Sequence, residues 1–570
     1  MASDQTELPP PFQDVPTAKE RRYDRQLRLW GAAGQMALED THLILINNGP
    51  GVTGVETLKN LVLPGIGQFT ILDSSIVSEA DLGVNFFLEP SSLGKFRADE
   101  TVKLLMELNP EVKGHAIKEP LESFISQDKI FAPYTLILVT APIDPAILSR
   151  IQLHAEALQI PTFYIHSVGF YSSFSIQIPP AFPIVETHPE PTATDDLRVL
   201  KPWPALQDFA NQKTTGLETM SAHEKSHIPY VCLLLYYLEV WRANHDGKAP
   251  ETYKEKAEFR DQYVRKGSPD EENFDEACAA VLKSLNPPTA NSTVRAILSS
   301  PEATELTPTS PPFWLIANAI HKFYTTHNQL PLPGAVPDMK AQSADYIKLQ
   351  NIYKAKARQD SAEVLTTVRE LERSTGRAPK LAIDEKEVEN FCRGAAHIHL
   401  VRGRPLQIVR PGEKVKFGDR AEDMLRELEN PESLVKLYLA FLAWDEFVAT
   451  HASSPEQAGG EGIRVPGDTD LGLEADGEKL TGIAHKLVDD LITEAGTRIE
   501  EPEYSEIREK VAAICEELVR AGGGELHNLA SLTGGMIAQE VIKVITRQYI
   551  PVDNTCLFDG VESRAYVLRV

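Results

Sequence analysis

The 570-residue sequence is poor in cysteine and in positive charge. Its five cysteines include no CxxC pair, which excludes a disulfide framework and a cysteine-rich metal centre and favours a reducing compartment. The 57 Lys and Arg residues are outnumbered by 82 Asp and Glu, so the net charge is −25. Nucleic acids and anionic membranes attract basic surfaces, so we expect neither as a partner.

Long apolar runs are also missing. The most apolar stretch, residues 230–238, is about half the ~20 residues that a membrane span requires. The first residues are acidic and rich in proline, unlike a secretory or mitochondrial signal. Because 42% of the residues are hydrophobic and 24% are charged, the composition is that of an ordinary folded protein. We therefore expect a soluble protein of the cytoplasm and nucleus.

The first 180 residues alternate between strand and helix patterns. Short apolar strands are expected at 41–47, 68–73, 135–140 and 161–167, and helices at 54–63, 97–108 and 145–158. This alternation is typical of a parallel sheet covered by helices on both faces. The sequence therefore predicts an α/β fold with a doubly wound, Rossmann-like domain.

The remaining chain divides by its sequence pattern into a mainly helical segment and a short segment with strand and helix patterns again. One large insertion inside one α/β domain is more economical than three domains in series. A window at 453–479, rich in Gly, Pro and acidic residues, predicts a disordered loop inside the insertion. The predicted parts are a flexible N-terminus at 1–20, the first part of the α/β domain at 21–180, the insertion at 181–480 and the return at 481–570.

A GxGxxG motif directly follows the first predicted strand. Its glycines are Gly49, Gly51 and Gly54, and Asp73 ends the second strand. Glycine lets a backbone approach phosphates at a helix N-terminus, and an acidic residue at the position of Asp73 can bind a ribose hydroxyl. The same glycines can simply form a turn that lets the helix contact the sheet. The motif alone leaves both interpretations open, and with Asp73 it also permits a dinucleotide-dependent oxidoreductase.

Motifs at both ends of the chain resemble one enzyme family. Residues 23–31 read YDRQLRLWG, and residues 534–543 read GGMIAQEVIK. Together with LKNL at 58–61 and FFL at 86–88, they resemble the adenylation domain of ubiquitin-like-modifier activating enzymes, relatives of the bacterial molybdopterin and thiamine adenylyltransferases. The resemblance implies a heterodimer of two adenylation folds in which Arg25 reaches the ATP bound by the partner subunit.

The positions that would carry catalysis in this family are changed. Val84 stands where active members have a phosphate-binding arginine, and Arg97 replaces a phosphate-binding lysine. The magnesium-binding aspartate is missing from residues 140–143, where neutral side chains cannot hold the ion. The resemblance therefore implies that the glycine motif and Asp73 are vestigial. It also implies that this subunit binds no metal or cofactor of its own and that ATP and Mg²⁺ belong to the partner.

No cysteine occurs in the setting of the family's thioester-forming nucleophile. Cys232 lies in the apolar run VCLLLYYL, which predicts an inert buried thiol. Cys278 and Cys515 lie in acidic helices, which should raise the pKa of a thiol.

The middle of the chain resembles one branch of the family. PDM at 337–339 and YIKLQNIY at 346–353 resemble the regulatory subunits of neddylation-activating enzymes, which serve the ubiquitin-like modifier attached to cullins. The implied partners are the catalytic subunit and the modifier. The pattern is also that of an amphipathic helix burying Ile347, Leu349 and Tyr353. A self-sufficient adenylyltransferase and a SUMO-pathway subunit are the alternatives. The implied subunit interface comprises His227, Asp338, Met339, Tyr346, Ile347, Lys348, Leu349 and Gln350.

Overall fold

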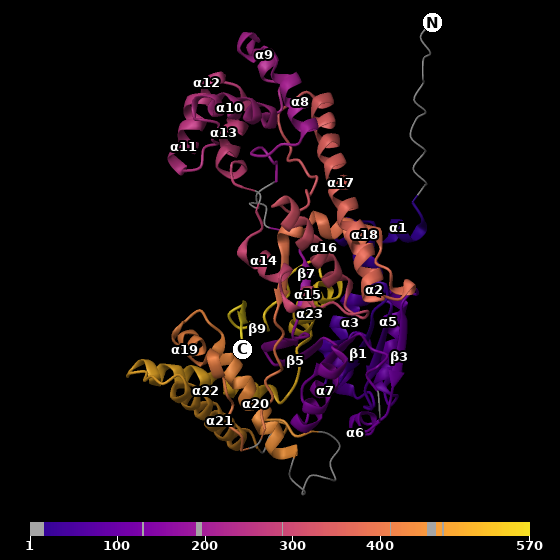
Figure 1. The fold of residues 1–570 in the computed structure, drawn as a ribbon. Helices are drawn as coiled ribbons and strands as arrows, with labels where there is room; N and C mark the ends of the chain where they lie inside the picture. The colour runs from indigo at the N-terminus through magenta and orange to yellow at the C-terminus, as the bar shows by residue number, and fades with distance from the viewer. Residues whose placement is uncertain are drawn as a thin grey trace. The chain divides into compact units, whose positions relative to one another are not determined.

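The computed structural model describes residues 16–127, 130–189, 196–268, 270–287, 289–410, 412–452, 463–469 and 472–570. The chain divides into two compact units, which are described separately (Figure 1). We call the first, Met1–Phe182 with Val401–Val570, the α/β unit, and the second, Pro183–Leu400, the helical unit. The described residues contain no helix that is long and apolar enough to cross a membrane.

The α/β unit is built on one sheet, which has eight strands among the described residues in the order β10-β9-β6-β5-β4-β1-β2-β3. The strands from β3 to β5 in that order run parallel, whereas β6, β9 and β10 add antiparallel pairs at the other edge. This arrangement confirms the predicted α/β class. The strands are β1 His42–Ile46, β2 Gln68–Leu72, β3 Lys113–Ile117, β4 Leu136–Thr140, β5 Thr162–Val168, β6 Tyr171–Gln177, β9 Thr555–Asp559 and β10 Arg564–Leu568.

Helices cover both faces of the sheet because successive strand residues point to opposite sides. In β1, Ile44 and Ile46 join the apolar cluster that contains Leu148 of α7, whereas Leu45 faces Gly54 of α3. The helices of this unit are α1 Ala18–Arg22, α2 Asp24–Glu39, α3 Val52–Val62, α4 Glu79–Val84, α5 Arg97–Leu108, α6 Leu121–Ile125, α7 Pro145–Leu158, α19 Ala421–Glu429, α20 Val435–Ala452, α21 Leu473–Glu494, α22 Glu503–Ala521 and α23 His527–Thr546.

The helical unit has its core where α8, α10, α13 and α17 meet. Leu233 and Trp241 of α10 and Phe274 of α13 are buried there together with Leu349 and Tyr353 of α17. A two-stranded sheet pairs β7 Phe182–Val185 with β8 Ile398–Val401. The helices are α8 Pro204–Thr214, α9 Ala222–Lys225, α10 Tyr230–Asn244, α11 Tyr253–Glu258, α12 Arg265–Gly267, α13 Glu272–Ser284, α14 Ser292–Leu298, α15 Pro301–Thr304, α16 Pro312–His327, α17 Ser343–Thr375 and α18 Glu385–Arg393.

The structure moves the second predicted boundary of the insertion. The helical unit ends at Leu400, and not at residue 480. The reason is the packing of α19 to α22, whose apolar side chains share a core with Leu557 of β9 and Leu568 of β10. These helices therefore belong to the α/β unit although their local patterns look like those of the insertion. The first boundary lies two residues from its predicted place, since the α/β unit breaks after Phe182.

Two segments predicted to be flexible are ordered where the structure describes them. The first is the N-terminus at 1–20. Residues 1–15 of it lie outside the described residues, and in the remainder Thr17 and Glu20 form a capping box that starts α1. In the 453–479 window, 453–462 and 470–471 lie outside the described residues. The rest is organised by the buried carboxylate of Asp476, which accepts hydrogen bonds from Arg464 and from the backbone of Gly467.

Candidate functional site

The glycine motif forms a tight loop between β1 and α3. Gly49 and Gly51 have φ values of 57° and 63°, in the left-handed region that favours glycine. A Cβ on Gly51 would lie 1.9 Å from Oδ1 of Asn47, and one on Gly54 would lie 2.7 Å from Cδ1 of Leu45. The turn and the close approach of α3 to the sheet therefore account for all three glycines without a ligand.

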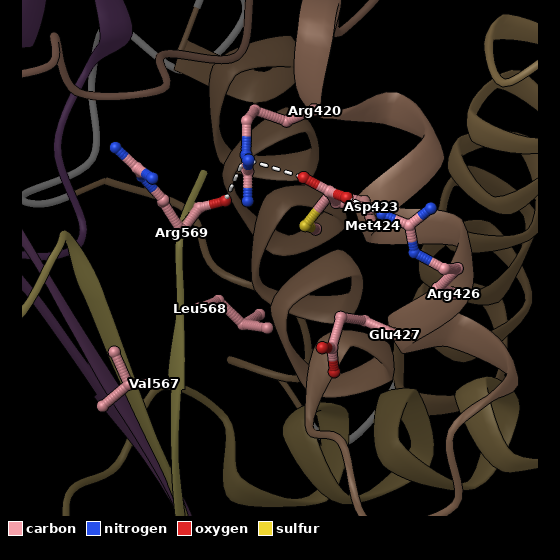
Figure 2. A pocket seen from close by; sticks show the side chains of 8 residues that line it. All are labelled: Arg420, Asp423, Met424, Arg426, Glu427, Val567, Leu568 and Arg569. Atoms are coloured by element: carbon pink, nitrogen blue, oxygen red, sulfur yellow. Dashed lines mark hydrogen bonds and ion pairs between the residues drawn. The ribbon is translucent and has the colours of Figure 1, made fainter. Parts of the chain in front are cut away.

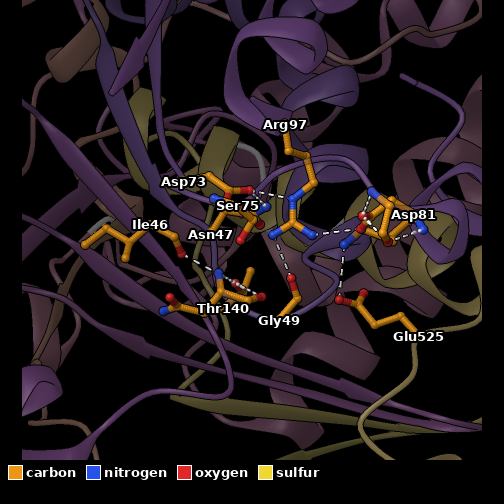
Figure 3. Close-up of polar contacts among 12 residues, drawn as sticks. Ile46, Asn47, Gly49, Asp73, Ser75, Asp81, Arg97, Thr140 and Glu525 are labelled. Carbon is orange, nitrogen blue, oxygen red and sulfur yellow. Dashed lines mark hydrogen bonds and ion pairs between the residues drawn. The ribbon is translucent and has the colours of Figure 1, made fainter. Parts of the chain in front are cut away.

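The N-terminus of α3 already carries an anion, which is the side chain of Glu525 (Figure 3). Its Oε1 accepts from the backbone N–H of Val52 at 3.1 Å, and its Oε2 accepts from the backbone N–H and the hydroxyl of Thr53 at 2.8 and 2.5 Å. Free N–H groups and the helix dipole make such an end an anion-binding position. In this chain a buried carboxylate from the segment before α23 fills it.

Burial and hydrogen bonding act on Glu525 in opposite directions. Burial disfavours the charged form and raises the pKa of Glu525 above its usual value, while the hydrogen bonds from Thr53, Val52 and Gly51 counteract part of this effect. The donors at the start of α3 thus offset part of the cost of burying a carboxylate. In return, the carboxylate satisfies donors that have no partner within the helix.

Arg97, the first residue of α5, holds the other side of the loop (Figure 3). Its Nε donates to Oδ2 of Asp73 at 2.7 Å, its Nη1 to Oδ1 of Asp81 at 2.8 Å, and its Nη2 to the carbonyl oxygen of Gly49 at 2.7 Å. Burial opposes the charge, but Asp73 and Asp81 outweigh it and raise the pKa of Arg97. The guanidinium is buried and engaged by three acceptors.

Asp73 lies next to the glycine loop as predicted, but both of its carboxylate oxygens are in use. Oδ2 accepts from Arg97 and from Nδ2 of Asn47, and Oδ1 accepts from the backbone N–H of Ser75. At the end of β4, the hydroxyl of Thr140 accepts from the backbone N–H of Asn48 at 2.8 Å. The loop therefore offers neither a free ribose-binding carboxylate nor a phosphate-binding cation, and the residues present do not fit a bound nucleotide.

Arg25 lies outside this site, in the first turn of α2. Tyr23, which is 2% exposed, and the buried Trp30 anchor this segment. The Arg25 side chain is exposed, and no described residue forms a hydrogen bond or an ion pair with it. By contrast, Arg28 pairs with Asp24 at 3.0 Å. The guanidinium of Arg25 is therefore held on an anchored helix and faces outward.

Comparison with known proteins decides the family. The ThiF family matches residues 23–568. A NEDD8-activating enzyme E1 regulatory subunit of Xenopus laevis is 36% identical over 95% of this chain and 97% of its own length. The chain belongs to the ThiF family and to its NEDD8-activating enzyme E1 regulatory subunits.

Relatives from distant organisms agree with this family. The NEDD8-activating enzyme E1 regulatory subunit of Drosophila melanogaster is 33% identical over 97% of this chain and 98% of its own length. The protein named AXR1 in Arabidopsis thaliana, another such subunit, is 31% identical over 98% of each chain. The resemblance seen in the motifs is confirmed. The alternatives of a SUMO-pathway subunit and a self-sufficient adenylyltransferase are not favoured.

The cysteines of this family member are all buried. Burial raises the pKa of Cys232, Cys392 and Cys515 to about 12 and that of Cys556 to about 11, and it also raises the pKa of Cys278. The prediction for Cys232 is confirmed. For Cys278 and Cys515 the direction was right, but burial and not the acidic helix is the main cause. Among the described residues, no group of three or more His, Cys, Asp or Glu is arranged to hold a metal ion.

The residues that the resemblance assigned to a subunit interface are divided between core and surface of the helical unit. Leu349 is fully buried in the unit's own core, and Met339 is also buried. Ile347 is 56% exposed, so the expectation that it is buried is wrong. The carbonyl of His227 accepts from the backbone N–H of Gln342, which brings His227 to the start of α17. The exposed members are His227, Asp338, Ile347 and Lys348, and the partly buried members are Tyr346 and Gln350.

The sequence-based interpretation missed Glu525, Asp81 and Asn47. Asp81 follows Ser78 in the capping box that starts α4, and this pattern explains the residue locally without pointing to Arg97. Glu525 follows three consecutive glycines just before α23, which marks a chain reversal but does not indicate where the carboxylate goes. Both roles depend on residues far along the chain.

Proposed function

We propose that this chain is the non-catalytic subunit of a heterodimeric, ATP-dependent activating enzyme for the ubiquitin-like modifier that is attached to cullins. Membership of the regulatory-subunit family supports the pathway. The observation that carries the non-catalytic role is the Glu525 carboxylate at the N-terminus of α3, where a phosphate would otherwise bind. The pairing of Arg97 with Asp73 and Asp81 supports the same conclusion.

In this proposal the chemistry belongs to the partner subunit. The partner adenylates the C-terminal carboxylate of the modifier, releases pyrophosphate, and transfers the modifier to its own cysteine. ATP and Mg²⁺ are bound there. The five cysteines of this chain are buried and have raised pKa values, so they are poor nucleophiles. This supports the proposal that the partner, and not this chain, forms the thioester. What this chain adds to the reaction is Arg25, whose side chain is exposed and without a partner among the described residues.

Arg25→Ala should slow adenylation by the heterodimer roughly ten- to a hundredfold without weakening its assembly. An arginine presents a planar, permanently charged group that matches phosphate oxygens, so its removal takes a charge-assisted contact from the reacting triphosphate. Arg25→Lys should recover only part of the rate. The measurement is ATP–pyrophosphate exchange by the reconstituted heterodimer at saturating modifier, with the isolated chain as a baseline that gives no exchange.

Arg28→Ala is the matched control, because Arg28 lies on the same helix but already pairs with Asp24. It should leave the exchange rate unchanged. A wild-type rate and wild-type ATP dependence in Arg25→Ala would remove Arg25 from the reaction and leave the chain as a scaffold. Pyrophosphate exchange by the isolated chain would overturn the non-catalytic assignment itself.

Substitutions at the start of α17 test the proposal that this chain forms a heterodimer with the catalytic subunit. Ile347→Asp should raise the dissociation constant for the catalytic subunit about thirtyfold, since an exposed apolar anchor in an interface typically contributes about 2 kcal/mol. Lys348→Glu should weaken binding in the same direction. Titration calorimetry measures both. Unchanged affinity in both variants, with circular dichroism showing intact folding, would remove this surface from the interface.

Leu349→Ala changes a buried residue close to the exposed Ile347 and Lys348, so its expected effect differs from theirs. Its side chain is buried in the core of the helical unit, so we expect a loss of about 2 to 5 kcal/mol in stability and not a specific loss of affinity.

A further inference from the structure

A depression in the helical unit lies between α17, α18 and the loop 333–335. Its volume is about 480 Å³, within the range of ligand-binding pockets. The loop touches α17 closely, since a Cβ on Gly334 would lie 2.7 Å from the Cβ of Ala357. Small residues and the loop backbone therefore form part of its lining. We call this depression the basic pocket; its lining is Pro333, Gly334, Ala335, Lys354, Ala357, Arg358, Ser361, Glu389 and Arg393.

Helix geometry accounts for the charged residues that line the basic pocket. Lys354 and Arg358 are four residues apart on α17 and therefore share one face, and Glu389 and Arg393 are related in the same way on α18. Three cations thus face one carboxylate. No described residue forms a hydrogen bond or an ion pair with the side chain of Lys354, Arg358 or Arg393, and all three are exposed.

A depression in the α/β unit illustrates the opposite case (Figure 2). It also contains three arginines, with a volume of about 360 Å³. There, however, Arg420 and Arg426 both pair with Asp423, and Arg569 pairs with Asp553. Its cations are neutralised by the chain itself, and we assign no ligand to it. The basic pocket differs because none of the described residues pairs with its cations, in a chain whose net charge is −25.

We propose that the basic pocket binds an acidic peptide segment of a protein partner, with a carboxylate of the segment between Lys354, Arg358 and Arg393. Three cations that line one depression attract an anion, and arginine forms paired hydrogen bonds with carboxylates. A lone oxyanion would fill only a small part of the 480 Å³. The small lining residues Pro333, Ala335 and Ala357 suit the aliphatic parts and backbone of a peptide.

The charge of the whole chain narrows the choice of ligand. A nucleic acid carries a continuous row of phosphates, which would meet the acidic surface of a protein with 82 Asp and Glu against 57 Lys and Arg. A short acidic segment needs only one local cluster of cations. Its binding should weaken with salt, because exposed charges are screened within about 10 Å at ordinary ionic strength.

Fluorescence polarisation with a fluorescein-labelled hexaglutamate peptide and the full chain tests the proposal. We expect saturable binding at low ionic strength that weakens as salt is added. The double variant Lys354→Glu with Arg358→Glu should weaken binding at least about tenfold, since it replaces attraction with repulsion. Glu389→Gln should tighten binding about two- to fivefold, because it removes the carboxylate that competes with the ligand. Misfolding cannot produce tighter binding.

Arg373→Glu is the control for charge reversal on α17 outside the pocket lining, and it reverses one charge where the double variant reverses two. It should leave the affinity within about twofold of wild type. Equal weakening by Arg373→Glu and the pocket variants would overturn the proposal in favour of a diffuse charge effect, as would no binding of the peptide. Inorganic phosphate should displace the peptide only at much higher concentration. Displacement at equal concentration would show a site for free oxyanions and overturn the peptide assignment.

Discussion

Glu525→Ala is expected to lower the free energy of unfolding of the α/β unit by about 3 to 5 kcal/mol. The carboxylate accepts hydrogen bonds from the backbone of Val52 and from the backbone and hydroxyl of Thr53. A buried donor that loses its acceptor costs roughly 1 to 3 kcal/mol, and α3 would also lose the anion at its positive end. Chemical unfolding followed by circular dichroism measures the change.

Glu525→Gln separates charge from hydrogen bonding. Its amide oxygen can still accept from Thr53, but its amide nitrogen would face the N–H of Val52, so we expect an intermediate loss of stability. Glu516→Ala removes an exposed carboxylate from α22 and should leave the unfolding midpoint unchanged. If Glu525→Ala proves as stable as wild type, solvent replaces the carboxylate and the loop does not depend on it.

Arg97→Met is expected to cost about 3 to 5 kcal/mol of stability at neutral pH. The variant leaves Asp73 and Asp81 buried without their cation and removes the hydrogen bond to the carbonyl of Gly49. Arg97→Lys should recover only part of the loss, because one ammonium group does not reach three acceptors in the geometry of a guanidinium. Lys103→Met, an exposed change on the same helix, is the control for lost charge on α5.

The cost of Arg97→Met should depend on pH. Burial of Asp81 favours the neutral acid, but hydrogen bonds from Ser78 and the charge of Arg97 outweigh it and lower the pKa of Asp81. In the wild type this contribution is present above the unfolded pKa of about 4 and is lost as pH falls through the lower folded pKa. In the variant, an unpaired Asp81 takes up a proton more readily. The cost should therefore shrink toward about pH 4, and a pH-independent cost would contradict the electrostatic explanation.

Local sequence patterns predicted the strands and helices of the sheet region well. They predicted less well to which of the two units the later helices belong. The helix expected at 97–108 is α5, and the strand expected at 68–73 is β2 within one residue. Both were predictable because hydrophobic periodicity and flanking turns depend on neighbouring residues in the sequence. The end of the insertion was misplaced, since α20 and α21 resemble their neighbours before residue 400. Only their contacts with Leu557 and Leu568, distant in sequence, assign them to the α/β unit.

The sequence indicated where the glycine motif and Asp73 lie in the fold, but the side chains that surround them were not predicted. Gly49 and Gly51 follow β1 and Asp73 follows β2, so the three lie at the carboxyl ends of two neighbouring parallel strands. The carboxylate that occupies the helix end comes from Glu525, and no local pattern connects it to Val52. The same limit applies to α17, where periodicity suggested a buried Ile347, although tertiary contacts bury Leu349 and Tyr353 and leave Ile347 exposed.

The hydrogen bond from the backbone of Val52 to Glu525 also has a consequence for biosynthesis, because it joins residues 473 positions apart. At roughly 5 to 20 residues per second, a ribosome needs about 25 to 95 seconds to make the intervening chain. Throughout that time the first turn of α3 exists without the carboxylate that completes it. The strands β9 and β10 of the same sheet are made later still. The helical unit, whose residues all precede Val401, is complete before the α/β unit that begins the chain can close.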